Sequence, residues 1–273
     1  MKDALIVSLL SVVPRNHGAR AMGWFARSAP SRWLTRAFVR IYGVNLDEAE
    51  GDLGDYPTLE SLFTRRLKPG ARTIDDAPGA LVSPVDGRCA AVGVTRGGML
   101  ALTTDQELNV ATLVGESLEE ASEVAVLYLS PKDYHRVHAA REGTVTRWRY
   151  LPGTLWPVFP AAVRRVRDLF CQNERLTLTH DTDLGPMYTV LIGAFGVGRI
   201  SSPLCDLVTN TGGPAASAPL QISVPRADEV GTFHLGSTVV LVLPQGAVHW
   251  NIEPGQPVKM GQAIAERPRQ LEG

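Results

Sequence analysis

The chain has 273 residues, enough for one large domain with a substantial core or for two small ones. Hydrophobic residues make up 44% and charged residues 20%, the composition of an ordinary folded protein. The three cysteines are widely spaced and form no C-x-x-C pair, which argues against a disulfide framework or a zinc ribbon. Buried, reduced thiols are expected at Cys89, Cys171 and Cys205.

The net charge of −1 hides an asymmetry between the amino-terminal segment and the rest of the chain. Residues 1–42 carry seven basic residues and one acidic residue, so this segment has a net charge of +6 and the remainder −7. A basic arm on an acidic body predicts an anionic partner for the arm. Nucleic acid and anionic lipid are both candidates at this point.

The amino-terminal segment has the pattern of interfacial helices. The apolar run Ala4–Val13 is too short to cross a bilayer, and no small-x-small cleavage site follows it. In residues 32–42 the arginines form one stripe at i, i+4 spacing, and the large apolar side chains lie away from it. We expect guanidinium groups to meet lipid phosphates while aromatic rings lie at headgroup depth. The alternative is a helix docked on the protein's own core with a solvated basic face.

Strand signals dominate after residue 80. A polar connector at residues 43–80 contains one short helix near Leu59–Arg66, and a second helix is expected at Ala161–Phe170. Runs rich in β-branched and aromatic residues, separated by Gly and Pro, predict strands at Val124–Leu129, Thr144–Tyr150, Tyr188–Ala194, Leu220–Val224 and Thr238–Leu243. The expected fold class is α+β, mainly β, with a barrel- or sandwich-hybrid-like body and an amino-terminal helical region.

Residues Glu253–Ala265 resemble the hammerhead turn of lipoyl- and biotinyl-type domains, and Ser83–Ala91 resembles another strand entry of that kind. A carrier or membrane-docking module is therefore an alternative to an enzyme. Such a carrier needs a lysine at a hairpin apex, whereas Lys259 lies within the hammerhead itself. A lipoyl or biotinyl adduct on an intact chain would favour the carrier.

The tetrapeptide LGST, at residues 235–238, lies between two strand-like runs near the carboxyl end. A tight hairpin or bulge explains Gly-Ser by itself. The arrangement also sets a hydroxyl beside an unhindered carbonyl. The oxygen of Ser237 can attack the carbonyl carbon of Gly236, because glycine has no Cβ and tolerates strained backbone angles. The product of that attack is an ester.

Two histidines, His135 and His138, lie three residues apart in the segment YLSPKDYHRVH, just after a predicted strand. If the segment is helical, the two rings share a face. Acid/base chemistry is the favoured role. No third ligand stands in an obvious motif, so no metal site is expected.

The segment SPVDG places Asp86 between a strand entry and a glycine. An aspartate there is commonly a turn former. It is also a candidate for the carboxylate that holds a histidine in the required tautomer.

Together these segments resemble the phosphatidylserine decarboxylase family, with LGST as that family's self-processing signature and SPVDG and YHRVH as its Asp and His segments. The resemblance covers about residues 45–265, and residues 1–40 match only in character. Further matching stretches follow in the same order: Tyr56–Asp75, Asn173–Arg175, Val190–Ile200 and Gly231–Phe233. The family varies at the positions of His234 and Leu235.

The resemblance implies a processing triad of Asp86, His138 and Ser237, in which His138 takes the serine proton and Asp86 orients the imidazole. The chain would cut itself into 1–236 and 237–273, leaving a covalent pyruvoyl group, derived from Ser237, as the cofactor. The enzyme would then decarboxylate phosphatidylserine to phosphatidylethanolamine. His135 is the candidate for the acid that protonates the substrate carbon.

Two regions are expected on this interpretation: amphipathic membrane-binding helices at 1–45 and the pyruvoyl-dependent decarboxylase domain at 46–273. The resemblance implies a peripheral protein on the cytoplasmic face of the cell membrane, with phosphatidylserine in an anionic membrane as its partner. The two cleaved chains should stay together, and a homodimer is one compatible assembly. A nucleic-acid-binding β-barrel would use the basic arm but would leave LGST and YHRVH unexplained, so no nucleic-acid partner is expected.

Overall fold

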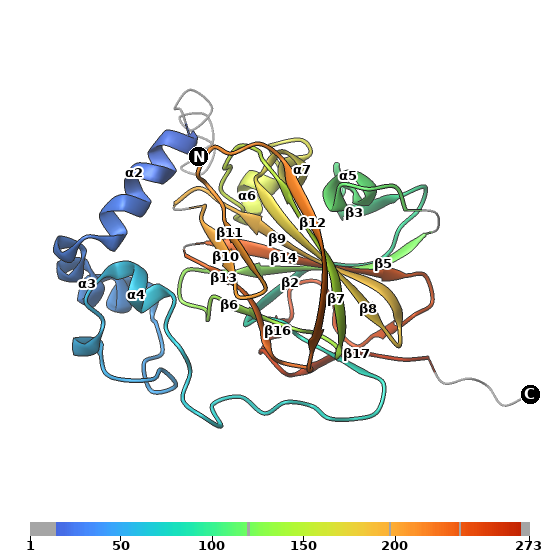
Figure 1. The fold of residues 1–273 in the computed structure, drawn as a ribbon, viewed down its shortest axis with the longest axis horizontal. Helices are drawn as coiled ribbons and strands as arrows, with labels where there is room; N and C mark the ends of the chain where they lie inside the picture. The colour runs from blue at the N-terminus through green and yellow to red at the C-terminus, as the bar shows by residue number, and fades with distance from the viewer. Residues whose placement is uncertain (1–14, 119–120, 197, 235, 269–273) are drawn as a thin grey trace, which may run out of the picture.

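The computed structural model describes residues 15–118, 121–196, 198–234 and 236–268, and it shows a β body with a group of helices on one side (Figure 1). The expected helix Ala4–Val13 lies outside the described residues. The amino-terminal helices are α2 (Arg15–Arg27), α3 (Arg32–Tyr42) and α4 (Leu59–Phe63), with 3₁₀ turns at Ala29–Ser31 and Leu53–Asp55. The body carries the short helices α5 (Val110–Val114), α6 (Pro160–Val163) and α7 (Leu169–Gln172).

An eight-stranded antiparallel sheet forms the centre of the body, in the order β12-β7-β8-β9-β14-β5-β2-β16. Its strands are β2 (Gly87–Val94), β5 (Ser122–Leu129), β7 (Gly143–Leu151), β8 (Arg175–Thr182), β9 (Gly185–Gly193), β12 (Ala216–Val224), β14 (Ser237–Pro244) and β16 (Pro257–Val258).

Three smaller sheets complete the described strands. The first, in the order β11-β10-β13-β6, contains β6 (Arg136–His138), β10 (Ile200–Ser202), β11 (Cys205–Val208) and β13 (Glu229–Phe233). The second contains β1 (Ala80–Val82), β15 (His249–Trp250) and β17 (Ala263–Glu266), and the third contains β3 (Met99–Thr103) and β4 (Gln106–Asn109).

The structure is mainly β, which is compatible with the expected α+β class, and all five predicted strands are present. Four have wider bounds than predicted, and β9 begins earlier but ends at Gly193, one residue before the predicted end. The sheets are open, so the barrel alternative is not observed: the eight-stranded sheet ends at β12 and β16 without closing. The single helix expected at Ala161–Phe170 is wrong. It is replaced by α6 and α7, which are separated by turns at residues 164–168, where Asp168 adopts a left-handed conformation (φ 52°) that a continuous helix does not allow.

Strand β14 is buried on both faces, which explains the unbroken apolar run at residues 239–243 within it. Val239 and Leu241 join the core between the large sheet and the four- and three-stranded sheets. Val240 and Val242 join a second core, beneath α5, α6 and α7. Residues directly paired on antiparallel strands share a face, so Ser237, paired with Leu129, faces the first of these two cores.

The helical region exposes an unusual amount of apolar surface. Of the nine exposed large hydrophobic residues in the described part of the chain, seven belong to α2 and α3. They are Met22, Trp24, Phe25, Trp33, Leu34, Ile41 and Tyr42. Trp33 is 87% exposed and Trp24 70%, whereas Phe38 packs on Phe63 of α4. None of the described helices has the length and apolar character needed to cross a membrane.

Candidate active site

Two chain segments lie next to each other, and each connects the eight-stranded sheet with the four-stranded sheet. One runs from Leu129 at the end of β5 to β6, and the other runs from Phe233 at the end of β13 to Ser237 at the start of β14. Their ends are tied together, because Phe233 N donates to His135 O at 2.9 Å and Ser237 pairs with Leu129. The histidine segment and the LGST segment, far apart in sequence, therefore meet at one junction.

Ser237 is held firmly at this junction. It is the first residue of β14 and pairs with Leu129 on one side and with Gly193 on the other. Its side chain is fully buried, and its Oγ has no hydrogen-bond partner among the described residues. Gly236 has φ +48°, a backbone conformation that L side chains rarely adopt, which gives a physical reason for glycine there. An unpaired buried hydroxyl is costly for stability, and at Ser237 it leaves the oxygen unoccupied next to the Gly236 carbonyl.

The other side of the LGST segment is anchored by His234. Its Nδ1 lies 3.0 Å from a carboxylate oxygen of Glu60 on α4, and its Nε2 lies 2.9 Å from Ser201 Oγ. Arg199 adds a 3.1 Å ion pair to the same Glu60 oxygen, and its carbonyl accepts from His234 N. The backbone on both sides of residues 235–236 is thus fixed, by β14 on one side and by this cluster on the other.

His138 has both ring nitrogens engaged. Nδ1 donates to the carbonyl of Ala227 at 2.6 Å, which leaves Nε2 as the acceptor for the Tyr134 hydroxyl at 3.0 Å. Burial lowers the pKa of His138, so the ring is neutral. No hydrogen bond joins His138 to Ser237 or to Asp86 in the described part of the chain. To act on Ser237, His138 must first exchange Tyr134 for the serine.

His135 has a free lone pair. Its Nδ1 donates to the carbonyl of Asp133 at 2.8 Å, and its Nε2 is buried without a partner among the described residues. Its ring packs on Phe63 at 4.0 Å between centroids. Complete burial lowers the pKa of His135 to about 3, so the ring is neutral at pH 7. A neutral imidazole with an unoccupied nitrogen can accept a proton from a nearby hydroxyl.

The segment is not a helix, so the helical condition for a shared face is not met: residues 136–138 form strand β6, and His135 precedes it. The two rings lie in different surroundings. His135 packs on Phe63, whereas His138 packs on Tyr134.

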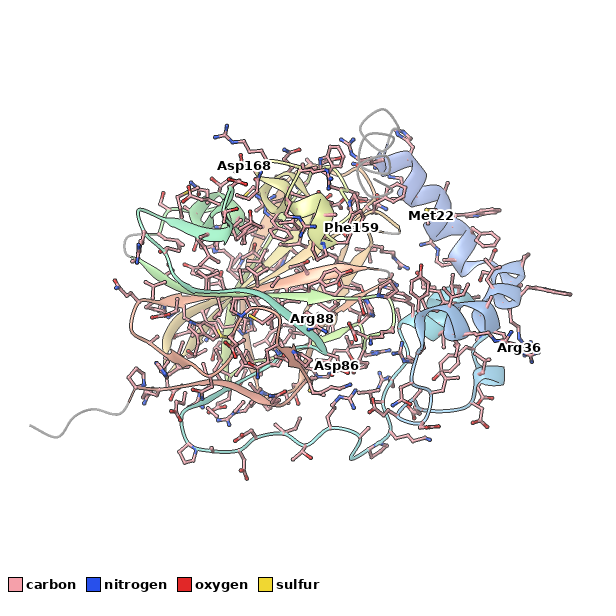
Figure 2. The ribbon with its side chains drawn as sticks, turned by 180° about the vertical axis from the view of Figure 1, so that it is seen from behind. Met22, Arg36, Asp86, Arg88, Phe159 and Asp168 are labelled. Carbon is pink, nitrogen blue, oxygen red and sulfur yellow. The ribbon has the colours of Figure 1, made fainter. Side chains whose placement is uncertain are left out.

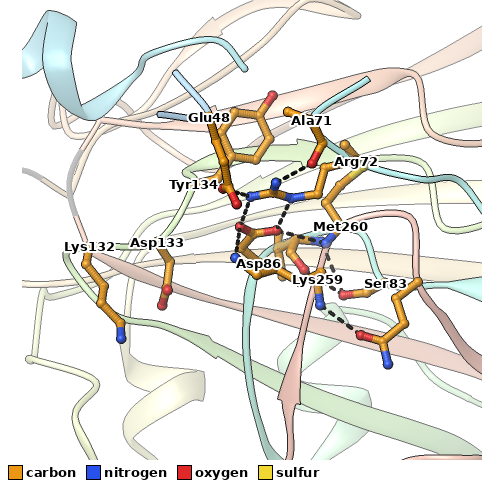
Figure 3. Close-up of polar contacts among 12 residues, drawn as sticks. Glu48, Ala71, Arg72, Ser83, Asp86, Lys132, Asp133, Tyr134, Lys259 and Met260 are labelled. Carbon is orange, nitrogen blue, oxygen red and sulfur yellow. Dashed lines mark hydrogen bonds and ion pairs between the residues drawn. The ribbon is translucent and has the colours of Figure 1, made fainter. Parts of the chain in front are cut away.

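Asp86 lies at the same end of the large sheet, one residue before β2 (Figure 2). Strand β5 separates β2 from β14, so the backbones of Asp86 and Ser237 lie about 10 Å apart. The Asp86 carboxylate accepts two bonds from Arg72, one from Lys259 Nζ at 3.2 Å and one from Met260 N at 2.9 Å (Figure 3). These occupy the roughly four acceptor positions of a carboxylate. Asp86 can orient a histidine only after releasing one of these donors.

The pKa of Asp86 is lowered. Burial acts to raise it, but the hydrogen bonds from Arg72 and Met260 and the positive charges of Arg72 and Lys259 outweigh burial. A lowered pKa in the folded chain means that the carboxylate stabilises the fold above the ordinary aspartate pKa of about 4. That stabilisation is lost as the pH falls through the lower folded value.

We therefore expect Asp86→Asn to lower the free energy of unfolding at pH 7 by about 3 kcal/mol or more, because it leaves the buried Arg72 without its main partner. The difference should shrink as the pH falls below about 4, because the unfolded parent chain then gains a proton that the folded carboxylate, with its lowered pKa, still resists. Urea denaturation at pH 7 and pH 3 measures the stability difference at each pH. The parent and the Asp86→Asn protein both carry Ser237→Ala, so that each is a single chain.

Asp168→Asn is the control, because Asp168 also pairs with an arginine, Arg167, but both side chains of that pair are exposed. Its effect should stay within about 1 kcal/mol. An Asp86→Asn protein as stable as this control would show that the Arg72 pair contributes little.

The structure thus brings the LGST and histidine segments together and places Asp86 at the same sheet end, but it assembles no hydrogen-bonded Asp86–His138–Ser237 triad. Two partners were missing from the sequence-based prediction. Tyr134 binds the ring of His138, and Arg72 binds Asp86. Both residues lie within stretches that carry the family resemblance, but the sequence did not predict their contacts with His138 and Asp86.

Lys259 lies beside Asp86 and forms an ion pair with it, in the turn between β16 and β17. It is thus engaged at the site and is not a free lysine at a hairpin apex, the position a carrier requires. In the described residues no group of His, Cys, Asp and Glu side chains has the arrangement of a metal site.

Comparison of the sequence with known proteins shows the family. Residues 59–266 match the family model described as phosphatidylserine decarboxylase. The chain is 38% identical to the phosphatidylserine decarboxylase proenzyme of Marinobacter nauticus, covering 97% of this chain and 99% of the relative. The chain is 37% identical to the proenzyme of Myxococcus xanthus and 39% identical to that of Anaeromyxobacter sp.. Each match covers 97% of this chain and 99% of the relative. The chain is a decarboxylase, and it belongs to the phosphatidylserine decarboxylase family.

Proposed function

We propose that the chain cuts itself between Gly236 and Ser237 and uses a pyruvoyl group made from Ser237 to convert phosphatidylserine into phosphatidylethanolamine. The observation that carries the proposal is the buried, unpartnered Ser237 hydroxyl, next to a glycine with positive φ. The name of the relatives, proenzyme, supports a cut chain as the active form.

The cut balances with one water molecule. Ser237 Oγ, deprotonated by a histidine, attacks the Gly236 carbonyl carbon, and the peptide nitrogen leaves as a free amine, giving an ester. A base then removes the Ser237 Cα proton, and the ester breaks by elimination. This gives a Gly236 carboxylate and a dehydroalanine at residue 237. Tautomerisation and hydrolysis release ammonia and leave a ketone.

The surroundings of Ser237 fit such a group. A residue buried against an apolar core removes water from a substrate carboxylate held beside it, which favours loss of neutral CO₂. A pyruvoyl group supplies an electron sink for the electrons that CO₂ leaves behind. We assign His135 to the proton donor, and a bound anionic substrate would raise its pKa from the low value in the free chain. His138 and Asp86 are assigned to the cut.

Intact mass under denaturing conditions tests the proposal directly. The expected result is two chains, 1–236 and 237–273, the second with a blocked amino terminus that resists Edman degradation. A single chain of full length in a preparation that releases CO₂ from phosphatidylserine would refute the self-cut.

We further propose that the protein is peripheral to the cytoplasmic face of the cell membrane. The apolar surface of α2 and α3 and the basic residues of the same segment support this, because lipid tails and anionic headgroups complement both. We also propose that the two cut chains stay together, and a homodimer is compatible with this proposal.

Liposome sedimentation should show binding that increases with the anionic lipid content and weakens with salt, because the +6 segment is attracted electrostatically. A Trp24→Ser, Trp33→Ser double variant should bind at least tenfold more weakly, because two exposed rings leave the headgroup layer. Val94→Ser, which removes an exposed apolar side chain of the β body, is the control. Retention that salt does not alter, or no binding at all, would contradict a peripheral mode.

A further inference from the structure

A polar cavity of about 270 Å³ lies beside Asp86. Gly43 and Asn45, which follow α3, form one wall, and residues 130 and 132–134 form another. The cavity therefore lies between the end of the exposed apolar helix α3 and the junction that holds Ser237. Ser130, in its lining, directly follows Leu129, the strand partner of Ser237.

The cavity lining has an excess of positive charge. Five basic and three acidic side chains contribute: Arg65, Arg72, Arg88, Lys132 and Lys259, with Glu48, Asp86 and Asp133. The acids are already engaged. Glu48 and Asp86 bind Arg72, Asp86 also binds Lys259, and Asp133 accepts from Ser130 N and Oγ at 2.7 Å each. This leaves Arg65, Lys132 and Arg88 without a carboxylate partner among the described residues, and Arg88 donates to the carbonyl of Gly255.

Arg65 is the unusual member of this set. It is only 4% exposed, and in the described part of the chain its Nε has no hydrogen-bond partner and no carboxylate lies within 4.0 Å of its guanidinium. Only backbone carbonyls, those of Leu62, Lys132 and Asp133, accept from it. Burying a guanidinium without a counter-ion is costly, so an anion in the cavity would stabilise it.

Arg65 is also tied to the candidate catalytic residues. The carbonyl oxygen of Asp133 accepts from Arg65 Nη2 at 3.1 Å and from His135 Nδ1 at 2.8 Å. The guanidinium and the imidazole thus share one acceptor atom. An anion bound by Arg65 would lie next to His135.

We propose that this cavity binds the phosphodiester of the lipid headgroup, through Arg65 and Lys132, while the carboxylate of the same headgroup reaches Ser237. The inference rests on the proposed function. A guanidinium fork and a mobile ammonium group are suited to phosphate oxygens. The headgroup would enter at the end of α3, and the acyl chains would remain in the membrane along the apolar surface of α2 and α3.

Lys132→Gln provides the test, because the Lys132 side chain has no hydrogen bond or ion pair within the described residues and its loss should not disturb the fold. With a short-chain, water-soluble phosphatidylserine, KM should rise about tenfold, the value of one charge-assisted hydrogen bond, and more than kcat falls. By the same argument, the inhibition constant of the competitive inhibitor glycerophosphoethanolamine should rise about tenfold in Lys132→Gln. The inhibition constant of ethanolamine, which has no phosphate, should not change.

Arg96→Gln is the matched control, because Arg96 is an exposed arginine in the turn between β2 and β3, away from the cavity. Equal KM changes in the two variants, or an unchanged KM in Lys132→Gln, would overturn the assignment. So would an equal loss of inhibition by ethanolamine. Arg65→Lys, which keeps the charge but loses the planar fork, should raise KM on its own, and an unchanged KM would remove Arg65 from the site.

Two further measurements separate the possible sources of the effect. Activity of the parent protein on the same soluble substrate tests the proposed function itself. An inactive parent protein would refute the proposed function, whereas an active parent with an unchanged KM in Lys132→Gln would refute only this site. Weaker binding of Lys132→Gln to phosphatidylglycerol vesicles, with an unchanged KM for soluble substrate, would show a general lipid-docking site and would refute a substrate site.

Discussion

The Ser237→Ala protein should be a single chain of full length that releases no CO₂ from phosphatidylserine. Without the hydroxyl no ester forms, so the Gly236–Ser237 bond persists and no ketone is generated. The fold should survive, because Ser237 Oγ makes no hydrogen bond in the described structure and alanine adds no atoms to the buried position. Denaturing mass spectrometry and CO₂ release, measured on the same sample, check both expectations.

Thr238→Val is the matched control. Thr238 is the next residue of β14, and its hydroxyl is likewise buried and without a partner among the described residues, but it faces the other side of the sheet. Valine keeps its shape. This variant should still yield two chains, whereas two chains from Ser237→Ala would refute the proposed chemistry.

His138→Ala and His135→Ala should fail at different stages. We expect His138→Ala to slow the cut by a factor of about 10² to 10⁴, the contribution of a positioned general base. His135→Ala should still give two chains, but with a kcat at least about 100-fold lower, because no group remains to protonate the substrate carbon. A time course of chain cutting, followed by CO₂ release from fully cut protein, separates the two stages.

The hydrogen bonds of the uncut chain make this test demanding. The Nε2 of His138 is occupied by Tyr134, whereas the Nε2 of His135 is free. An uncut His135→Ala protein beside a normally cut His138→Ala protein would reverse the two assignments. Tyr134→Phe removes the competing hydroxyl, so the cut should be at least as fast if His138 is the base. A failure of Tyr134→Phe to cut would place that hydroxyl in the reaction.

The sequence allowed the central strands to be predicted because each signal was local. The run at 239–243 is apolar at every position, as expected for a strand buried on both faces, and this holds without knowledge of its neighbours. The prediction of one helix at 161–170 failed because α6 already ends at Val163 and a stretch of turns, including the left-handed Asp168, leads to α7; no strong local signal marks that break. The closed barrel could not be tested from local pattern, because closure depends on which strands lie at the sheet edges.

For the site, motif resemblance located the residues but not their partners. LGST, YHRVH and SPVDG do meet at one end of one sheet. The ion pair of Arg72 with Asp86 links positions in separate stretches, and such a pairing is set by tertiary packing. The same holds for Glu60, which reaches His234 across 174 positions of sequence.

The central position of β14 has a consequence for the cut protein. Chain 237–273 would contribute the strand that pairs with both β5 and β9 along most of its length, as well as β15, β16 and β17. Unfolding would then release two molecules from one, so the melting temperature should rise with protein concentration in the cut enzyme but not in Ser237→Ala. Once separated, the short chain would have to find its place between two strands whose edges are exposed only while it is absent. Such edges pair readily with other chains, so cut enzyme that has been denatured should aggregate where the uncut variant refolds.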